Sequence, residues 1–266
     1  METLNLSYDE YWGYYWRVTG RHRIPGIFKW DQDLVELIEK QCQIQKGASI
    51  LDLGCGGGDQ AKLFSRKGYR VVGIDKVKSL IDYAKEIFEK EGLVGEFYHA
   101  DMRKIEYRDQ FDLCVVLSGT FGLLTEKENE RLLNLIYRAL KPGGQAYLSY
   151  SSLERYSVLP HIRTWHSIDG GFALSEEWFD AATSTHNSKN MHILTEGKII
   201  QAKEETDYNA DEIIRCYGAR EIELLSEKAG FNVKAHLSNK NIGNPDYVPE
   251  VGEPRGNIIL VKKKLT

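Results

Sequence analysis

The chain has 266 residues, of which 42% are apolar and 28% are charged, and its formal net charge is −4. These values resemble globular averages and allow one full hydrophobic core, while the lack of basic excess makes nucleic acid an unlikely partner. No apolar run is long enough to cross a membrane, and the N-terminus lacks a secretory pattern. The four scattered cysteines, without a C-x-x-C pair, favour free thiols in a reducing cytoplasm.

The N-terminal segment is rich in aromatic side chains. Tyr8–Trp16 reads Y-D-E-Y-W-G-Y-Y-W, and six of its nine residues are aromatic. Tyr8, Tyr11, Trp12 and Tyr15 recur at i, i+3, i+4 and i+7, which predicts one face of a helix. Such a face usually packs on the core, although Tyr and Trp also suit the wall of a half-wet pocket because they carry polar tips.

A basic turn and a second helix follow. Arg21–Gly26 reads R-H-R-I-P-G, and its arginines could bind a carboxylate through paired hydrogen bonds or could simply be solvated. The next helix is expected over Asp31–Gln43.

The most informative segment is Ile50–Gly58, which reads I-L-D-L-G-C-G-G-G. Its apolar residues around Asp52 predict a short buried strand, and its glycines predict a tight turn where a ligand can touch the backbone. A helix expected over Gln60–Arg66 would point its N-terminal amides back at this turn. The segment therefore predicts a cradle for a small polar molecule.

Polar residues stand at the ends of the strands that follow. Gly68–Asp75 is an apolar run ending in a carboxylate, at the place where an acid can accept both hydroxyls of a ribose. Phe97–Asp101 and Phe111–Leu117 predict two more strands, and Ser118-Gly119 ends the second. A helix over Glu126–Leu140, the turn Lys141–Gly144 and a strand over Gln145–Tyr150 complete this part.

Residues 151–210 form an excursion from the strand and helix alternation. Glu176–Phe179 is expected to be a short helix, and Met191–Thr206 a hairpin that turns at Glu196-Gly197. Four histidines lie here: His161, His166, His186 and His192. Histidine is the natural general base near neutral pH, and His166, beside Trp165, is the candidate, although a lone histidine is more often an ordinary surface residue.

Residues 211–266 return to the sheet. Ala219–Gly230 predicts an amphipathic helix that Gly230 ends, and Phe231–Leu237 and Asn257–Lys263 predict an antiparallel edge pair. No repeat or flexible linker divides the chain. Residues 1–266 are therefore expected to form one domain with four parts: 1–45, 46–150, 151–210 and 211–266.

These motifs resemble, in order and spacing, the class I S-adenosylmethionine (SAM)-dependent methyltransferases of the small-molecule type. The matching pieces are I-L-D-L-G-C-G-G-G, V-V-G-I-D, A-D-M, F-D-L-C-V-V-L-S and L-K-P-G-G. The resemblance implies a Rossmann-like α/β fold, with a seven-stranded, mostly parallel sheet, helices on both faces and an antiparallel edge strand. It also implies an N-terminal helical lid and an insertion that covers the substrate.

The resemblance assigns roles to single residues. Gly54 and Gly56 would approach the methionine part of SAM, Asp75 would hold the ribose, and Asp101 would accept from the adenine amino group with Met102 against the ring. Asp52 would complement the ammonium and sulfonium, and Leu117 and Ser118 would line the transfer site. The implied cofactor-binding set is Asp52, Gly54, Cys55, Gly56, Asp75, Lys76, Asp101, Met102, Leu117 and Ser118. The lid would bring substrate-side residues: Tyr11, Tyr14, Tyr15, Trp16 and Arg23.

The function that follows is methyl transfer from SAM to a small-molecule O, N or C nucleophile, with S-adenosylhomocysteine as product. A tRNA or protein methyltransferase and a non-catalytic SAM-binding subunit stay open as alternatives. A nicotinamide-binding fold is disfavoured because Asp59 stands where its third glycine belongs. No metal is expected, no spacing in the chain identifies a catalytic base beyond His166, and the oligomeric state stays open.

Overall fold

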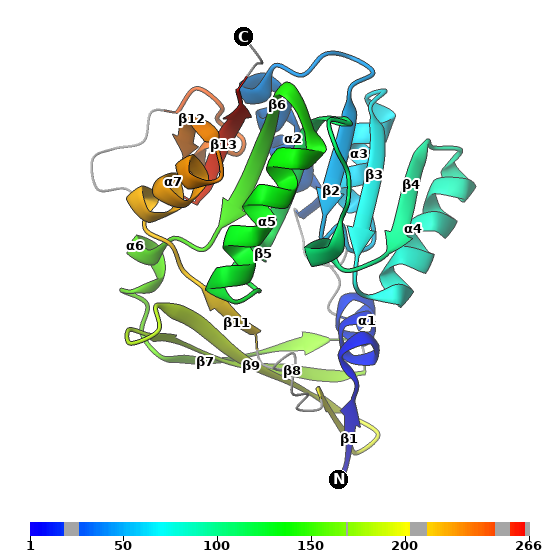
Figure 1. Ribbon diagram of the computed structural model, residues 1–266. Helices are drawn as coiled ribbons and strands as arrows, with labels where there is room; N and C mark the ends of the chain where they lie inside the picture. The colour runs from blue at the N-terminus through cyan, green and yellow to red at the C-terminus, as the bar shows by residue number, and fades with distance from the viewer. Residues whose placement is uncertain (19–26, 169, 203–211, 248–255, 264–266) are drawn as a thin grey trace.

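The computed structural model describes residues 1–18, 27–168, 170–202, 212–247 and 256–263 (Figure 1). Its larger sheet has seven strands in the order β12-β13-β6-β5-β2-β3-β4. Five of them run parallel: β2 (Ser49–Leu53), β3 (Arg70–Asp75), β4 (Gly95–His99), β5 (Phe111–Phe121) and β6 (Leu140–Tyr150). β13 (Asn257–Lys262) pairs antiparallel with β6, and β12 (Phe231–Leu237) pairs antiparallel with β13. The expected Rossmann-like sheet with an antiparallel edge is confirmed.

Helices cover both faces of this sheet because its strands are apolar on both sides. Ile50 of β2 packs with α2 (Ile27–Cys42), α3 (Asp59–Arg66) and α4 (Lys78–Glu91). Its neighbour Leu51 points to the opposite face and packs with α5 (Glu126–Ala139) and α7 (Ala219–Lys228). Within the described residues, the connections contain the short helices η2 (Met102–Lys104), α6 (Leu153–Tyr156) and η3 (Asn239–Asn241).

A second sheet lies below the first in Figure 1. Its strands follow the order β1-β10-β9-β8-β7, and β11 also pairs with β9. Their bounds are β1 (Glu2–Leu6), β7 (Ile162–Ile168), β8 (Gly171–Asp180), β9 (Thr185–Leu194), β10 (Lys198–Ala202) and β11 (Glu212–Arg215). The expected hairpin is confirmed as far as Ala202 by the pairing of Ile193 with Ile199, and its residues 203–206 lie outside the described residues. The N-terminal strand β1, which pairs parallel with β10, was not expected from the sequence.

Three expectations about local structure were wrong. Glu176–Phe179 is not a helix but part of β8. This segment pairs residue by residue with β9, and these hydrogen bonds between strands outweigh its local preference for a helix. Lys141–Gly144 belongs to β6, since the strand already meets β5 where Leu140 pairs with Phe111. The helix expected from Asp31 begins four residues earlier, at Ile27.

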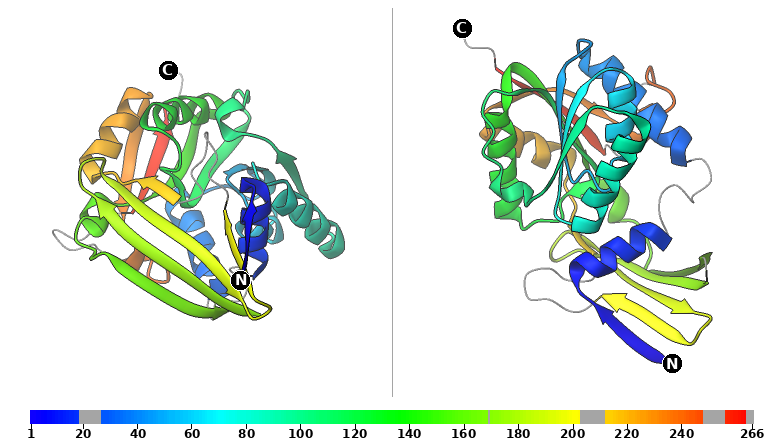
Figure 2. Two further views of the ribbon diagram at one scale, coloured as in Figure 1. Left: turned by 90° about the horizontal axis from the view of Figure 1, so that it is seen from below. Right: turned by 90° about the vertical axis from the view of Figure 1, so that its right-hand side faces the viewer.

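Helix α1 (Tyr8–Val18) lies between the two sheets (Figure 2). Tyr11 and Trp12 are buried in one apolar cluster with Val77 and Leu80, which lie at the start of α4, and with Ile200 of the second sheet. A Cβ added at Gly13 would lie 2.2 Å from the Ser79 hydroxyl, so a larger residue here would require the Ser79 side chain to move. The helix therefore joins the two halves of the molecule.

Candidate cofactor and active site

A cavity of about 560 Å³ opens at the carboxyl ends of the parallel strands. Its walls come from the turn after β2, the ends of β3 and β5, the loop after β4 and the start of α5. Tyr8 and Trp12 of α1 close one side, and Thr185, Ile213 and Arg215 reach it from the second sheet. All ten residues of the implied cofactor-binding set line this cavity. Their contacts with a cofactor stay a prediction.

The turn after β2 is held against β3 and leaves its backbone open to the cavity. The carbonyl of Ile74 accepts from the N–H of Gly54 at 2.8 Å and from that of Cys55 at 3.1 Å. A Cβ at Gly54 would lie 2.5 Å from Thr120, whereas one at Gly56 would meet nothing within 4 Å. Both glycines have positive φ, of 75° and 53°. The space above Gly56 is thus available to a ligand that touches the backbone.

Asp75 lies at the end of β3 and is fixed by backbone donors. Its Oδ2 accepts from the N–H of Gly56 at 2.9 Å, and its Oδ1 accepts from the N–H of Val77 at 2.8 Å. Burial raises the pKa of Asp75, and these two N–H groups and that of Lys76 act in the opposite direction. A carboxylate offers about four acceptor positions, so acceptor capacity for a ribose hydroxyl is left.

Asp52 and Cys55 form the floor of the turn. The Asp52 side chain is only 2% exposed. Burial, followed by the nearby charges of Asp52 and Asp75, raises the pKa of Cys55 well above that of an ordinary thiol. Cys55 is therefore a neutral thiol that lies beside the carboxyl groups of Asp52 and Asp75. Two acidic side chains at the floor would suit a cationic ligand.

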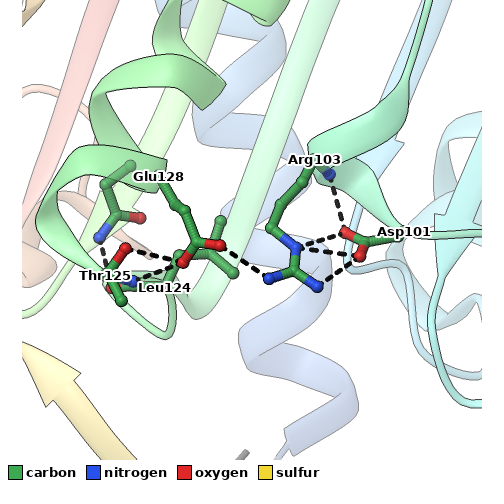
Figure 3. A network of polar contacts seen from close by, with 6 residues as sticks. Asp101, Arg103, Leu124, Thr125 and Glu128 are labelled. Atoms are coloured by element: carbon green, nitrogen blue, oxygen red, sulfur yellow. Dashed lines mark hydrogen bonds and ion pairs between the residues drawn. The ribbon is translucent and has the colours of Figure 1, made fainter. Parts of the chain in front are cut away.

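A charged network not foreseen from the sequence lines another part of the cavity (Figure 3). Arg103 donates to Asp101 through Nη2 at 2.6 Å and to Glu128 through Nη1 at 2.8 Å. Burial alone would raise the pKa of Asp101, but the bonds from Arg103 outweigh it and lower the pKa. The only sequence signal for this role is a cation two residues after the acidic strand end.

The end of β5 has an unusual backbone. Leu117 is buried, and Ser118 adopts a left-handed φ of 54°, which is uncommon for a residue with a side chain. Just beyond, the carbonyl of Gly122 accepts from the N–H of Arg215 at 2.9 Å and ties β11 to this end of β5. The Arg215 side chain bonds Glu221 and lies over the ring of Tyr217 at 4.8 Å. Sequence analysis missed Arg215, Thr185 and Ile213 because only the second sheet brings them here.

The aromatic residues of α1 divide differently from the expectation. Tyr8 and Trp12 line the cavity, whereas Tyr11, Tyr14 and Tyr15 do not. These three rings surround His192 of β9, with centroids 6.1, 5.2 and 5.9 Å away, because their side of the helix faces the second sheet. Tyr11, Tyr14 and Tyr15 are therefore not part of the cavity lining, and their expected substrate-side role stays an untested prediction. The side chain of Trp16 and all of Arg23 lie outside the described residues.

The candidate base His166 is not brought to the cavity. It lies on β7, is exposed and pairs with Ala173. Two other histidines bond acids of β8: His161 contacts Glu176 at 2.7 Å and His186 contacts Glu177 at 3.2 Å. Among the residues the structure describes, none of the cavity-lining side chains is a histidine, and no cluster of His, Cys, Asp and Glu could hold a metal ion.

Comparison with known proteins finds methyltransferases among the relatives of this chain. Residues 50–144 match the family model described as a methyltransferase domain. The chain is also 28% identical over 195 residues to a ubiquinone/menaquinone biosynthesis C-methyltransferase of Haemophilus ducreyi, over 71% of this chain and 66% of that protein. These matches support a class I SAM-dependent methyltransferase. The chain spans less than two thirds of the length of the curated relatives it matches, with 41%, 46% and 57% of three others covered.

Solved methyltransferase structures share the whole fold. A SAM-dependent methyltransferase of Clostridium acetobutylicum has a TM-score of 0.72 at 16% identity, over 96% of this chain and 99% of that one. A SAM-bound amino pentose methyltransferase of Micromonospora echinaspora has a TM-score of 0.64 at 17% identity, over 98% and 99%. Among the described helices of this methyltransferase, none is long and apolar enough to span a membrane.

The residues of this methyltransferase site fit SAM. The space above Gly56 can take the methionine part of the cofactor, and Asp75 keeps acceptor capacity for the ribose. The buried Asp52 would place a carboxyl group near the ammonium and sulfonium of SAM.

Proposed function

We propose that this protein transfers a methyl group from SAM to a small-molecule acceptor by in-line displacement at an O, N or C nucleophile. The observation that carries the proposal is the continuity of the cavity from the Gly54–Gly56 turn to the side chains of Ile213 and Arg215. An acceptor in this space would lie between the cofactor and the second sheet. The cavity therefore has room for a second, small reactant.

Positioning is the main contribution of the protein. SAM supplies an electrophilic methyl group on a sulfonium. The Gly54–Gly56 turn and Asp75 would hold the cofactor, while Leu117 and Ser118 would border the reacting atoms. Holding two reactants in line in this way can lower a barrier by ~7–11 kcal/mol. A base is needed only for a nucleophile that starts out protonated, so the lack of histidine among the described cavity-lining residues is compatible with transfer.

The walls of the cavity near the second sheet are mixed in character. Trp12 and Ile213 provide apolar surface, while Thr185 and Arg215 provide donors. This lining favours a partly apolar acceptor with polar groups. The Haemophilus relative is named for C-methylation in quinone biosynthesis and the Micromonospora neighbour for an amino pentose, so names of similar proteins favour small acceptors without selecting the atom.

The net charge and the cavity count against the two alternative functions, a tRNA methyltransferase and a non-catalytic SAM-binding subunit. A tRNA methyltransferase needs clustered cations to neutralise phosphates, and the net charge of −4 counts against it. A non-catalytic SAM-binding subunit would have a filled acceptor space, which the cavity does not favour.

We also propose that residues 1–266 act as one unit, with the N-terminal part and the insertion enclosing the acceptor. The four free and buried cysteines suit a reducing compartment, for which we propose the cytoplasm.

Isothermal titration with SAM, S-adenosylhomocysteine and a nicotinamide dinucleotide tests the cofactor. We expect micromolar binding of the first two and no heat from the third. Formation of S-adenosylhomocysteine in the presence of pooled small amines, phenols and quinols would then test transfer. Binding of the nicotinamide dinucleotide without binding of SAM would overturn the proposal.

A further inference from the structure

Arg103 stands at the centre of the charged network that borders the cavity. Its Nε lies 3.0 and 2.9 Å from the two oxygens of Asp101, and its backbone N–H donates to Asp101 Oδ1 at 2.9 Å. Together with the Nη2 bond, three N–H groups of one residue therefore point at a single carboxylate. The Asp101 side chain is 17% exposed and that of Arg103 29%, so water competes only partly for these bonds.

The geometry leaves Asp101 able to accept one more donor. A carboxylate has about four acceptor positions, and Arg103 offers it three hydrogens: the backbone N–H bonds Oδ1, Nη2 bonds Oδ2, and the single Nε–H is shared between both oxygens. One acceptor position of the Asp101 carboxylate is left, and Asp101 lines the cavity. The carboxylate cannot rotate without breaking its bonds to the planar guanidinium, so it can accept one N–H donor that approaches from a fixed direction.

The guanidinium is itself anchored to a second element. Its Nη1 donates to Glu128 Oε1, while Glu128 Oε2 accepts from the N–H and the hydroxyl of Thr125 at 3.1 and 2.8 Å. The bond from the Thr125 N–H to Glu128 is one half of the capping box at the start of α5, whose other half is the bond from the Glu128 N–H to the Thr125 side chain. The position of Arg103 is thus set from the loop after β4 and from α5 at once.

We propose that Arg103 is a positioning residue, which holds Asp101 in place as the acceptor for the adenine amino group of SAM. The inference rests on the proposed function, because it takes SAM as the ligand of this cavity. In this proposal, Arg103 fixes the orientation of the Asp101 carboxylate, and Glu128 connects the Arg103–Asp101 pair to α5. Arg103 itself is not required to touch the cofactor.

The test compares two ligands in three proteins. The ligands are S-adenosylhomocysteine and its 6-deamino analogue, in which hydrogen replaces the adenine amino group. The proteins are wild type, Arg103→Met and Arg108→Met, a matched control because Arg108 is exposed and lies outside the cavity lining. Wild type and Arg108→Met should prefer S-adenosylhomocysteine by about tenfold, the worth of one bond to a charged acceptor. Arg103→Met should bind it about tenfold more weakly while the affinity for the analogue hardly changes.

Glu128→Gln supplies a second variant that keeps the Arg103–Asp101 pair and a cap for α5. It should lose part of the discrimination with little change in thermal stability. Equal weakening of both ligands in Arg103→Met would show a merely structural role, and tighter binding would show that Arg103 blocks the adenine position. Either result overturns the inference while the proposed function stands. A wild type that binds both ligands equally would overturn it as well, whereas no binding of either would also remove the proposed function.

Discussion

The carboxylate of Asp9 in α1 accepts a hydrogen bond from the backbone N–H of Lys78, the first residue of α4, at 2.6 Å. This N–H has no partner within its own helix, so Asp9 supplies the cap from a distant part of the chain. The bond fastens α1 over the cavity at the same end where Tyr8 and Trp12 line it. Closure of the site is therefore connected to the start of α4.

Replacing Asp9 with Ala should loosen α1. The loss of this cap should cost about 1 kcal/mol, and the affinity for SAM should fall because Tyr8 and Trp12 leave the cavity wall more often. Limited proteolysis within α1 and titration with SAM would measure both effects. Asp9→Asn keeps an acceptor oxygen and serves as the control. Equal proteolysis of the two variants would show that Asp9 does not fasten the helix.

Replacing Asp75 with Asn should weaken the binding of S-adenosylhomocysteine. The amide cannot accept from a ribose hydroxyl and the backbone N–H groups at once, and each bond to a charged acceptor is worth ~1.5–3 kcal/mol. Calorimetric titration would measure the loss. Asp82→Asn, at an exposed position of α4, provides the control. Unchanged affinity in Asp75→Asn would place the ribose elsewhere.

Gly54→Ala and Gly56→Ala should separate folding from binding. Both need a left-handed backbone, which costs a residue with a Cβ about 1–2 kcal/mol. Only the Cβ at position 54 also meets Thr120, so Gly54→Ala should lower the melting temperature more. The Cβ at position 56 enters open space, so Gly56→Ala should mainly lower the affinity for SAM. The opposite order in the two measurements would contradict the arrangement of the turn.

The buried His192 should make stability depend on pH. Burial lowers its pKa from an ordinary value near 6.5 to about 4. Between these values the unfolded chain binds a proton that the folded protein excludes, so stability should fall as the pH drops from about 6.5 to about 4. The melting temperature should change less with pH across this range in His192→Gln than in wild type. His161→Gln, at an exposed site, should keep the wild-type dependence, and an identical dependence in both variants would argue against the shift.

His166→Ala should leave methyl transfer within about twofold of wild type, because His166 is exposed on β7 and outside the cavity lining. Initial rates at saturating SAM would measure this once an acceptor is known. A large loss of turnover with unchanged affinity for SAM would restore His166 as a base and would require the second sheet to rearrange.

The sequence was sufficient for the cofactor half of the molecule. The glycines after β2 and the acids at Asp75 and Asp101 lie within short segments whose strand and turn patterns are local. Parallel strands of such a sheet place their carboxyl ends at one edge, so the convergence of these residues on one cavity followed from the order of the elements.

The acceptor side was decided by tertiary structure. Glu176–Phe179 reads as a helix alone and becomes a strand only because β9 supplies its hydrogen-bond partners. Tyr8 rather than Tyr11 reaches the cavity because the second sheet fixes the rotation of α1. On the cofactor side, Arg103 also meets Glu128 only after η2 and α5 have packed together. Pairings between residues far apart in the chain leave no periodic trace in the sequence, and those of the second sheet build the part of the site that would select the acceptor.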